Sequence, residues 1–140
     1  MRALLFAATI ALCAPEASAG SAALQRSDDG HWHAASRVNG RAITLLVDTG
    51  ATFVTLTQAD ARAAGIDVRH LDYDQRMRTA SGTARAARVK LERVQIGGVR
   101  LRDVDAMVIE RGLSTSLLGQ SFLNRLEQFQ VRGQMLRLQD

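Results

Sequence analysis

The feature that most constrains this sequence is an acidic residue at the end of an apolar run. Residues 45–52 read LLVDTGAT, so Asp48 directly follows three large apolar side chains and precedes Thr49 and Gly50. The run over residues 42–47 is rich in leucine and β-branched side chains, which predicts a strand buried on both faces. A carboxylate beside such a strand is costly unless the fold gives it polar partners or a chemical role.

The first nineteen residues have the pattern of an export signal. Met1 and Arg2 are a short positive region, residues 3–14 are almost entirely apolar, and residues 17–19 are the small residues of a cleavage site. We therefore expect residues 1–19 to be a signal peptide and the protein to be exported, either periplasmic or secreted. The apolar stretch is shorter than the ~20 residues that span a bilayer. An uncleaved segment would instead be a membrane tether at the inner membrane.

The rest of the chain predicts a polar linker over residues 20–30 and one domain over residues 31–140. The single cysteine, Cys13, lies in the expected signal, so the domain depends on burial and oligomerisation rather than on disulfides. The net charge is +4, but the arginines are scattered and aromatic residues are few. This pattern argues against nucleic acid as a partner.

Turn signals and alternating apolar residues predict a mainly β chain with one or two short helices. Asn39-Gly40 is the preferred centre of a tight hairpin, and residues 53–56 read as a short strand. Thr57 with Asp60 three residues later predicts a helix start, and Gly65 its end. Two further strand pairs are predicted, around Gly97-Gly98 and around Arg132-Gly133.

The Asp-Thr-Gly segment has a chemical interpretation that two later segments reinforce. Gly50 lets the backbone turn sharply and offers its N–H to the carboxylate, while Thr49 and Thr52 supply hydroxyl groups. Some 70 residues further on, LLGQSFL (117–123) predicts an apolar strand, a close-packed glycine and a short helix. Between the two, RTASGTARA (78–86) predicts a hairpin turn.

The order of these segments resembles one lobe of the retropepsin-like aspartic proteases, in particular the bacterial single-domain exported type. The resemblance covers about residues 31–139, and its anchors are 45–52 and 117–123. It implies a mainly β closed barrel with one lobe per chain, and an aspartic endopeptidase that hydrolyses peptide bonds. It implies no cofactor and no metal.

The resemblance also implies a role for particular residues. Asp48 corresponds to the catalytic acid, and Thr49 to the threonine that interlocks across a dimer axis. Thr52 stands where retroviral enzymes usually carry an acid, which bears on substrate preference more than on catalysis. The implied site residues are Asp48; Thr49, Gly50, Ala51 and Thr52 of the active-site loop; Ala80, Ser81 and Gly82 at the tip of a substrate-binding flap; and Leu117, Leu118 and Gly119 of the strand that crosses the loop.

The mechanism that such a site uses requires two carboxylates. Two neighbouring aspartates share one proton, so that the ionised one activates water and the protonated one donates to the scissile carbonyl. Only Asp48 has the Asp-Thr-Gly context in this chain. We therefore expect the second carboxylate to be Asp48 of another copy in a C2 homodimer, with a peptide or protein as substrate.

Two other classes of function remain open. A catalytically silent fold of this family would be a dimeric peptide-binding or regulatory module, and a structural envelope β-domain would give Asp48 no role. Intact Thr49 and Gly50 favour the enzyme over the silent module.

Other polar residues have simpler interpretations. His31 and His33 would share a strand face but lack a third metal ligand. The serines outside the Asp-Thr-Gly segment have no nucleophile motif and read as turn or capping residues; they are Ser81, Ser116 and Ser121. Met107 and Phe122 read as core residues. The basic residues near the expected flap either favour acidic substrates or simply face solvent; they are Arg76, Arg78, Arg85, Arg88 and Lys90.

Overall fold

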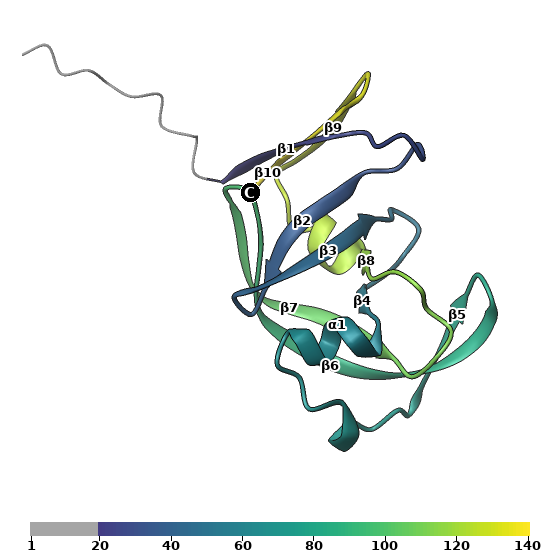
Figure 1. The fold of residues 1–140 in the computed structure, drawn as a ribbon. Coiled ribbons are helices and arrows are strands. Elements are labelled where there is room, and N and C mark those ends of the chain that lie inside the picture. The colour runs from purple at the N-terminus through teal and green to yellow at the C-terminus, as the bar shows by residue number, and fades with distance from the viewer. Residues whose placement is uncertain (1–19) are drawn as a thin grey trace, which may run out of the picture.

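The computed structural model describes residues 20–140, which fold into a barrel and a smaller sheet beside it (Figure 1). The predicted signal peptide or tether, residues 1–19, lies outside the described residues. Within residues 20–140, no helix has the length and apolar character needed to cross a membrane.

The larger sheet has seven strands in the order β2-β3-β8-β4-β7-β6-β5, and a further pairing of β2 with β6 closes it into a barrel that leaves β5 outside. The strands are β2 (His33–Val38), β3 (Arg41–Val47), β4 (Val54–Leu56), β5 (Gln75–Thr79), β6 (Gly82–Ile96), β7 (Val99–Ile109) and β8 (Leu117–Leu118). The pairings of β3 with β8 and of β4 with β7 are parallel. The predicted mainly β barrel is confirmed.

The hairpin of β2 and β3 turns at Asn39 and Gly40, as predicted. Both residues have positive φ angles, 51° and 81°, as a two-residue turn of this kind requires. The prediction that residues 42–47 are buried on both faces was wrong. Ile43 and Leu45 are buried whereas Thr44 is exposed, because β3 lies in a barrel wall with one face toward solvent.

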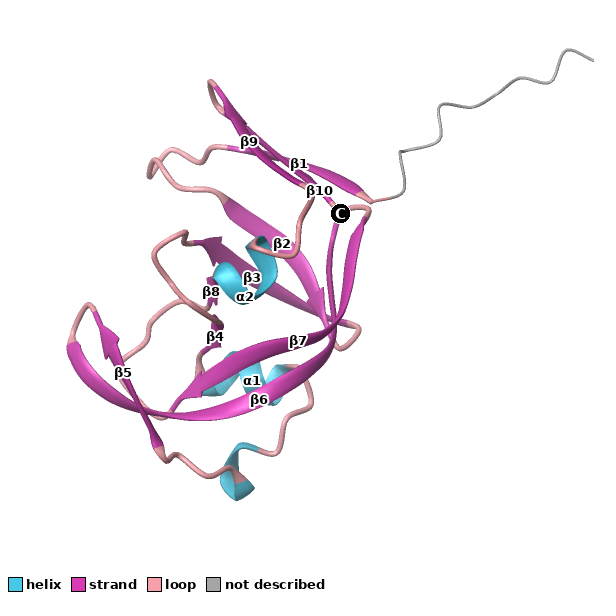
Figure 2. Cartoon of the chain, turned by 180° about the vertical axis from the view of Figure 1, so that it is seen from behind, coloured by secondary structure: helices cyan, strands magenta, loops and turns pink. Residues whose placement is uncertain are grey.

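The longest strands, β6 and β7, run side by side as one hairpin (Figure 2). Leu91 and Val94 of β6 are both buried although alternation would place them on opposite faces. Between their β7 partners, Val104 and Leu101, lies Asp103 with a φ of 53°. This bend switches the face that the hairpin turns toward the core, so one hairpin serves two sides of the barrel.

The hydrophobic core divides into two clusters. Each cluster contains one of the two residues that were predicted to be buried, Phe122 and Met107. Phe122 is fully buried in the main cluster, together with Leu45, Leu118 and residues of the smaller sheet. Met107 belongs to a second cluster with Ala86 and Ile109, against which side chains of the flap and of the loop after Asp48 pack.

Short helices flank the barrel, as predicted. Helix α1 (Gln58–Ala63) begins after Thr57, whose hydroxyl accepts from the backbone N–H of Asp60 over 3.1 Å. Gly65, with a φ of 84°, ends it. A single 3₁₀ turn, η1 (Val68–His70), follows, and helix α2 (Gln120–Leu123) comes directly after β8.

The smaller sheet corrects the prediction of a linker over residues 20–30. Strand β1 (Ser21–Gln25) pairs with β10 (Met135–Gln139), which pairs in turn with β9 (Gln128–Arg132). Leu24 and Leu136 lie opposite each other and pack on the main core, as do Ala22 and Leu138. The segment is polar overall, but its alternating apolar positions bury one face and keep it in the fold.

Candidate active site

Asp48 leaves the end of β3 and is held by the backbone on both sides. Its N–H donates to the carbonyl oxygen of Leu118 over 3.0 Å, and its carbonyl accepts from the N–H of Ala51 over 3.2 Å. The Gly50 N–H donates to the carboxylate oxygen Oδ1 over 2.9 Å, as predicted. Oδ2 has no hydrogen-bond partner within the described chain. The half-buried carboxylate is thus oriented by one oxygen and left open at the other.

The threonines of the loop do not bond the acid within one chain. Thr49 and Thr52 are exposed, and neither hydroxyl forms a hydrogen bond within residues 20–140. Their backbone carbonyls are held instead: Thr49 accepts from the side-chain amide of Gln120, and Thr52 from the N–H of Ser121, each over 2.8 Å. Helix α2 therefore fixes the loop and leaves the two hydroxyls free.

Strand β8 crosses the loop where the sequence places it. Leu117 pairs with Leu46, and Leu118 with Val47. At Gly119 a Cβ atom would lie 2.3 Å from the carbonyl oxygen of Phe53 and 2.7 Å from that of Ala51. Only glycine fits this crossing, because both neighbours are backbone atoms that belong to the loop itself.

Two serines that flank the crossing strand anchor it, which sequence reasoning did not anticipate. Ser116 is fully buried; its hydroxyl donates to Asp60 Oδ2 over 2.5 Å and accepts from the Thr57 N–H over 3.0 Å. Ser121 donates to the carbonyl of Asp105 over 2.6 Å and accepts from the Val54 N–H over 2.8 Å. Their only signal in the sequence is a small polar residue on either side of the Leu-Leu-Gly run.

The predicted flap tip lies in the turn between β5 and β6. Ala80 and Ser81 form the turn, and Gly82, with a φ of 120°, begins β6. The Ser81 hydroxyl donates to the carbonyl of Gly112 over 2.9 Å. The tip and the loop over residues 112–114 border an open cavity of about 640 Å³. The hairpin turn predicted over these residues is present, and its role as a flap that contacts substrate stays a prediction.

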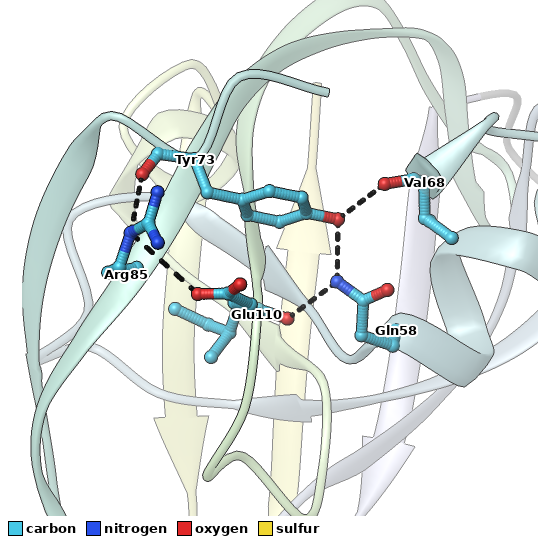
Figure 3. Close-up of polar contacts among 6 residues, drawn as sticks. Gln58, Val68, Tyr73, Arg85 and Glu110 are labelled. Atoms are coloured by element: carbon cyan, nitrogen blue, oxygen red, sulfur yellow. Dashed lines mark hydrogen bonds and ion pairs between the residues drawn. The ribbon is translucent and has the colours of Figure 1, made fainter. Parts of the chain in front are cut away.

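The base of the flap is held by a polar network that the sequence did not reveal (Figure 3). The Tyr73 hydroxyl donates to the carbonyl of Val68 over 2.8 Å and accepts from the Gln58 amide over 2.6 Å. Arg85 donates from Nε to the carbonyl of Tyr73 over 3.0 Å and lies 3.8 Å from Glu110. The Gln58 amide also donates to the carbonyl of Ile109 over 3.1 Å, so helix α1 and strand β7 are both linked to the flap.

The basic residues in and near the flap lie on two opposite faces of its strands. Arg76 lies opposite Arg85 and Arg78 opposite Thr83, so these three cations share one face. Arg88 and Lys90 lie on the other face, with Met77 and Ala84 of the flap. The Arg88 guanidinium lies 5.4 Å from the ring of Phe53, and both cations approach the same carboxylate, Asp105, at 3.6 and 3.9 Å.

Both histidines contact Asp29, His33 through its ring and His31 through its backbone N–H. His33 Nε2 lies 2.7 Å from Asp29 Oδ2, and this hydrogen bond lowers the pKa of Asp29 below its usual 3.8. In the part of the chain that the structure describes, no three side chains of the metal-binding types gather in one place.

An Asp-Thr-Gly loop resting on an apolar-apolar-Gly strand, in a barrel that supplies one such loop, defines the aspartic proteases that have one lobe per chain. The chain belongs to the retropepsin-like aspartic protease family. A family model described as "gag-polyprotein putative aspartyl protease" matches residues 34–125, which include both Asp48 and the crossing strand. The resemblance seen in the sequence is thereby confirmed.

Solved structures agree with this assignment. A retropepsin-like aspartic protease from Rickettsia conorii shares 35% identity and a TM-score of 0.76, over 85% of this chain and 98% of that one. The EIAV protease complexed with the inhibitor HBY-793 shares the fold alone, with 16% identity and a TM-score of 0.55 over 66% of this chain and 84% of that one.

Two curated relatives are longer than this chain. A protein from the cobV 5′ region of Sinorhizobium sp is 42% identical over 118 residues, which are 84% of this chain and 51% of the relative. Protein RP867 of Rickettsia prowazekii (strain Madrid E) is 36% identical over 119 residues, which are 85% and 51%. Both relatives are described as uncharacterized. The chain thus spans about half the length of the curated relatives it matches.

Proposed function

We propose that the protein is an exported aspartic endopeptidase, which hydrolyses peptide bonds with water activated between two Asp48 carboxylates of a homodimer. The proposal rests on the way in which the Asp48 carboxylate is hydrogen-bonded. Oδ1 is held by the Gly50 N–H, whereas Oδ2 has no partner within residues 20–140. A carboxylate oriented in this way is prepared to share a proton and a water molecule with a second one.

The chemical step follows from that pair. One Asp48 is ionised and removes a proton from water as the water attacks the scissile carbonyl carbon. The other is protonated and donates its proton to the carbonyl oxygen, giving a tetrahedral diol. Collapse of the diol breaks the C–N bond, and the leaving amine takes up a proton. Since each chain has one Asp-Thr-Gly segment, the pair requires two chains.

Two surface features support the homodimer. Thr49, Gly50 and Thr52 are exposed in the single chain, so the loop is available to a second copy of itself. On β9, an edge strand of the smaller sheet, Phe129 is 39% exposed and Val131 is 48% exposed. An unpaired strand edge with apolar side chains favours pairing with another chain.

The test is cleavage of a peptide library between about pH 4 and 7 by the wild type and by Asp48→Asn, since shared-proton pairs work in mildly acidic solution. The proposal predicts cleavage by the wild type and none by the variant, with identical circular dichroism spectra. A wild type that dimerises but cleaves no peptide would instead support the silent peptide-binding module.

A further inference from the structure

Four arginines converge on one cavity in a part of the barrel that the proposed chemistry does not use. Arg37 comes from β2, Arg93 from β6, and Arg100 and Arg102 from β7. They line a cavity of about 510 Å³ beside the turn of β2 and β3. These four residues form the arginine face.

Strand register places these side chains together. Gln95 lies opposite both Arg37 of β2 and Arg100 of β7, which makes one row across three strands. Arg93 lies opposite Arg102 in the next row on the same face. Because Val94 and Leu101 point into the core here, the residues on either side of them point outward.

The charge of the arginine face is not neutralised by the protein. Within residues 20–140, none of the four guanidinium groups lies within ion-pair distance of a carboxylate. The carboxylate of Asp140 is nearby, but it accepts from the backbone N–H of Arg100 over 3.0 Å. Arg93 and Arg102 are directly opposed like charges, an arrangement that costs stability unless an anion lies between them.

The arginine face lies beside the point where the N-terminal segment joins the fold. The N–H of Gly20 donates to the carbonyl of Gly98 over 2.9 Å, and the N–H of Gly98 donates to the carbonyl of Ser21 over 2.8 Å. Gly98 is in the turn between β6 and β7, two residues before Arg100. Gly20, the first residue that the structure describes, therefore joins the barrel beside the turn that precedes Arg100, and the sequence before it contains the apolar residues 3–14.

We propose that the arginine face binds the phosphate groups of anionic membrane phospholipids and holds the barrel against a bilayer with the β6–β7 turn toward it. Guanidinium forks match phosphate oxygens in charge and geometry. A negatively charged lipid surface attracts basic side chains that lie close to an apolar anchoring segment. This binding is separate from peptide hydrolysis, so either proposal can fail without the other.

The experiment is co-sedimentation of the full chain with vesicles of phosphatidylcholine, alone or mixed with phosphatidylglycerol. The wild type is expected to bind the anionic vesicles at least roughly tenfold more tightly than the neutral ones, and to lose this preference in high salt. Attachment through the apolar residues 3–14 alone would show no dependence on lipid charge, and any contribution of the positive Met1-Arg2 region would stay the same when arginines of the barrel are replaced. Equal binding to both vesicles would therefore overturn the proposal.

Two charge-matched variants localise the effect. Arg100→Gln/Arg102→Gln removes two charges from the arginine face, and Arg76→Gln/Arg78→Gln removes two from the flap. The first is expected to abolish most of the preference for anionic vesicles and the second to keep it, each with an unchanged circular dichroism spectrum. Equal losses in both would mean that net charge alone acts, which contradicts a defined site. Arg37→Gln is a second test of the same face should the double variant fold poorly.

A further measurement distinguishes the phosphate group of a lipid from that of a soluble ligand. Thermal shift of the wild type and of Arg100→Gln/Arg102→Gln is measured with inorganic phosphate and with pyrophosphate. Stabilisation that needs Arg100 and Arg102, in a protein that shows no preference for anionic vesicles, would assign the face to a soluble phosphorylated ligand and overturn the membrane proposal.

Discussion

The backbone N–H of Asp48 donates to the carbonyl oxygen of Leu118 over 3.0 Å. This bond continues the parallel pairing of β3 with β8 by one residue, so the acid stands where the two strands end together. The loop that carries the carboxylate is therefore positioned by a segment distant in the sequence. Changes in that segment should alter the site without touching Asp48.

Gly119→Ala should be severely destabilising. The new Cβ would lie 2.3 Å from the carbonyl oxygen of Phe53, and neither backbone segment can move without shifting the loop after Asp48. We expect a loss of ~3 kcal/mol or more in the free energy of unfolding, at the upper end of overpacking effects, measured by urea denaturation. The control is Gly133→Ala, at an exposed turn with no atom within 4 Å of the new Cβ, although its φ is 57°. That variant should lose only about 1 kcal/mol, and equal losses would contradict this account of the crossing.

Ser116→Ala should weaken the link between helix α1 and the crossing strand. The buried hydroxyl joins Asp60 to the Thr57 N–H, so its removal leaves both groups short of a partner. We expect a loss of about 1–3 kcal/mol in the free energy of unfolding. The exposed neighbour Ser114, changed to alanine, should have almost no effect. A Ser116→Ala protein as stable as the Ser114→Ala protein would show that the hydroxyl has no structural role.

Arg88→Glu should change substrate preference, on the proposal that the protein cleaves peptides. The Arg88 guanidinium lies over the ring of Phe53. Within residues 20–140, Arg88 and Lys90 share Asp105 as their one carboxylate partner, which leaves a positive charge on the face that carries Met77. We expect kcat/KM for peptides with glutamate near the scissile bond to fall roughly tenfold relative to glutamine analogues, about the effect of one close charge pair. Arg78→Glu, which lies on the opposite face of the flap, should leave that ratio unchanged. An equal change of this ratio in both variants would mean that the overall charge of the flap acts at long range, rather than that Arg88 contacts the substrate.

Phe129→Thr/Val131→Thr should weaken self-association. These two side chains make the free edge of β9 apolar, and threonine keeps the preference for a strand while it reduces apolar area. Sedimentation velocity should show a dimer that dissociates at protein concentrations where the wild type remains associated. Peptide cleavage should be lost on dilution and recovered on concentration. Gln128→Thr on the same strand is the control, and a dimer unaffected by the double change would exclude β9 from the interface.

Much of the fold could be predicted because its turns have local chemistry. Asn39-Gly40, the Thr57 cap and the Gly97-Gly98 turn act within a few residues, and each lies where the pattern predicted it. Strand β1 escaped prediction because its pairing partner, β10, lies at the other end of the chain, and five residues with only a few apolar positions resemble a linker.

The active-site loop could be predicted from the sequence, whereas the residues that hold this loop in place could not. Asp48, Gly50 and Gly119 belong to patterns whose residue types their geometry demands. By contrast, Gln58 and Ser116 act through contacts with residues more than fifty positions away, and the local sequence of Gln58 does not distinguish it from an ordinary surface residue. The bend at Asp103, which turns the arginine face outward, likewise becomes evident only once β6 and β7 are paired.

The most direct test of a shared site is subunit mixing. A fixed amount of wild type is equilibrated with increasing Asp48→Asn protein, and peptide cleavage is followed. If each site needs Asp48 from both chains, activity falls to about half at equal amounts and to about a quarter with threefold excess variant, because random pairing leaves fewer wild-type pairs. Activity that stays constant as the variant is added, while mixed dimers form, would show that one chain suffices and would contradict the proposed mechanism.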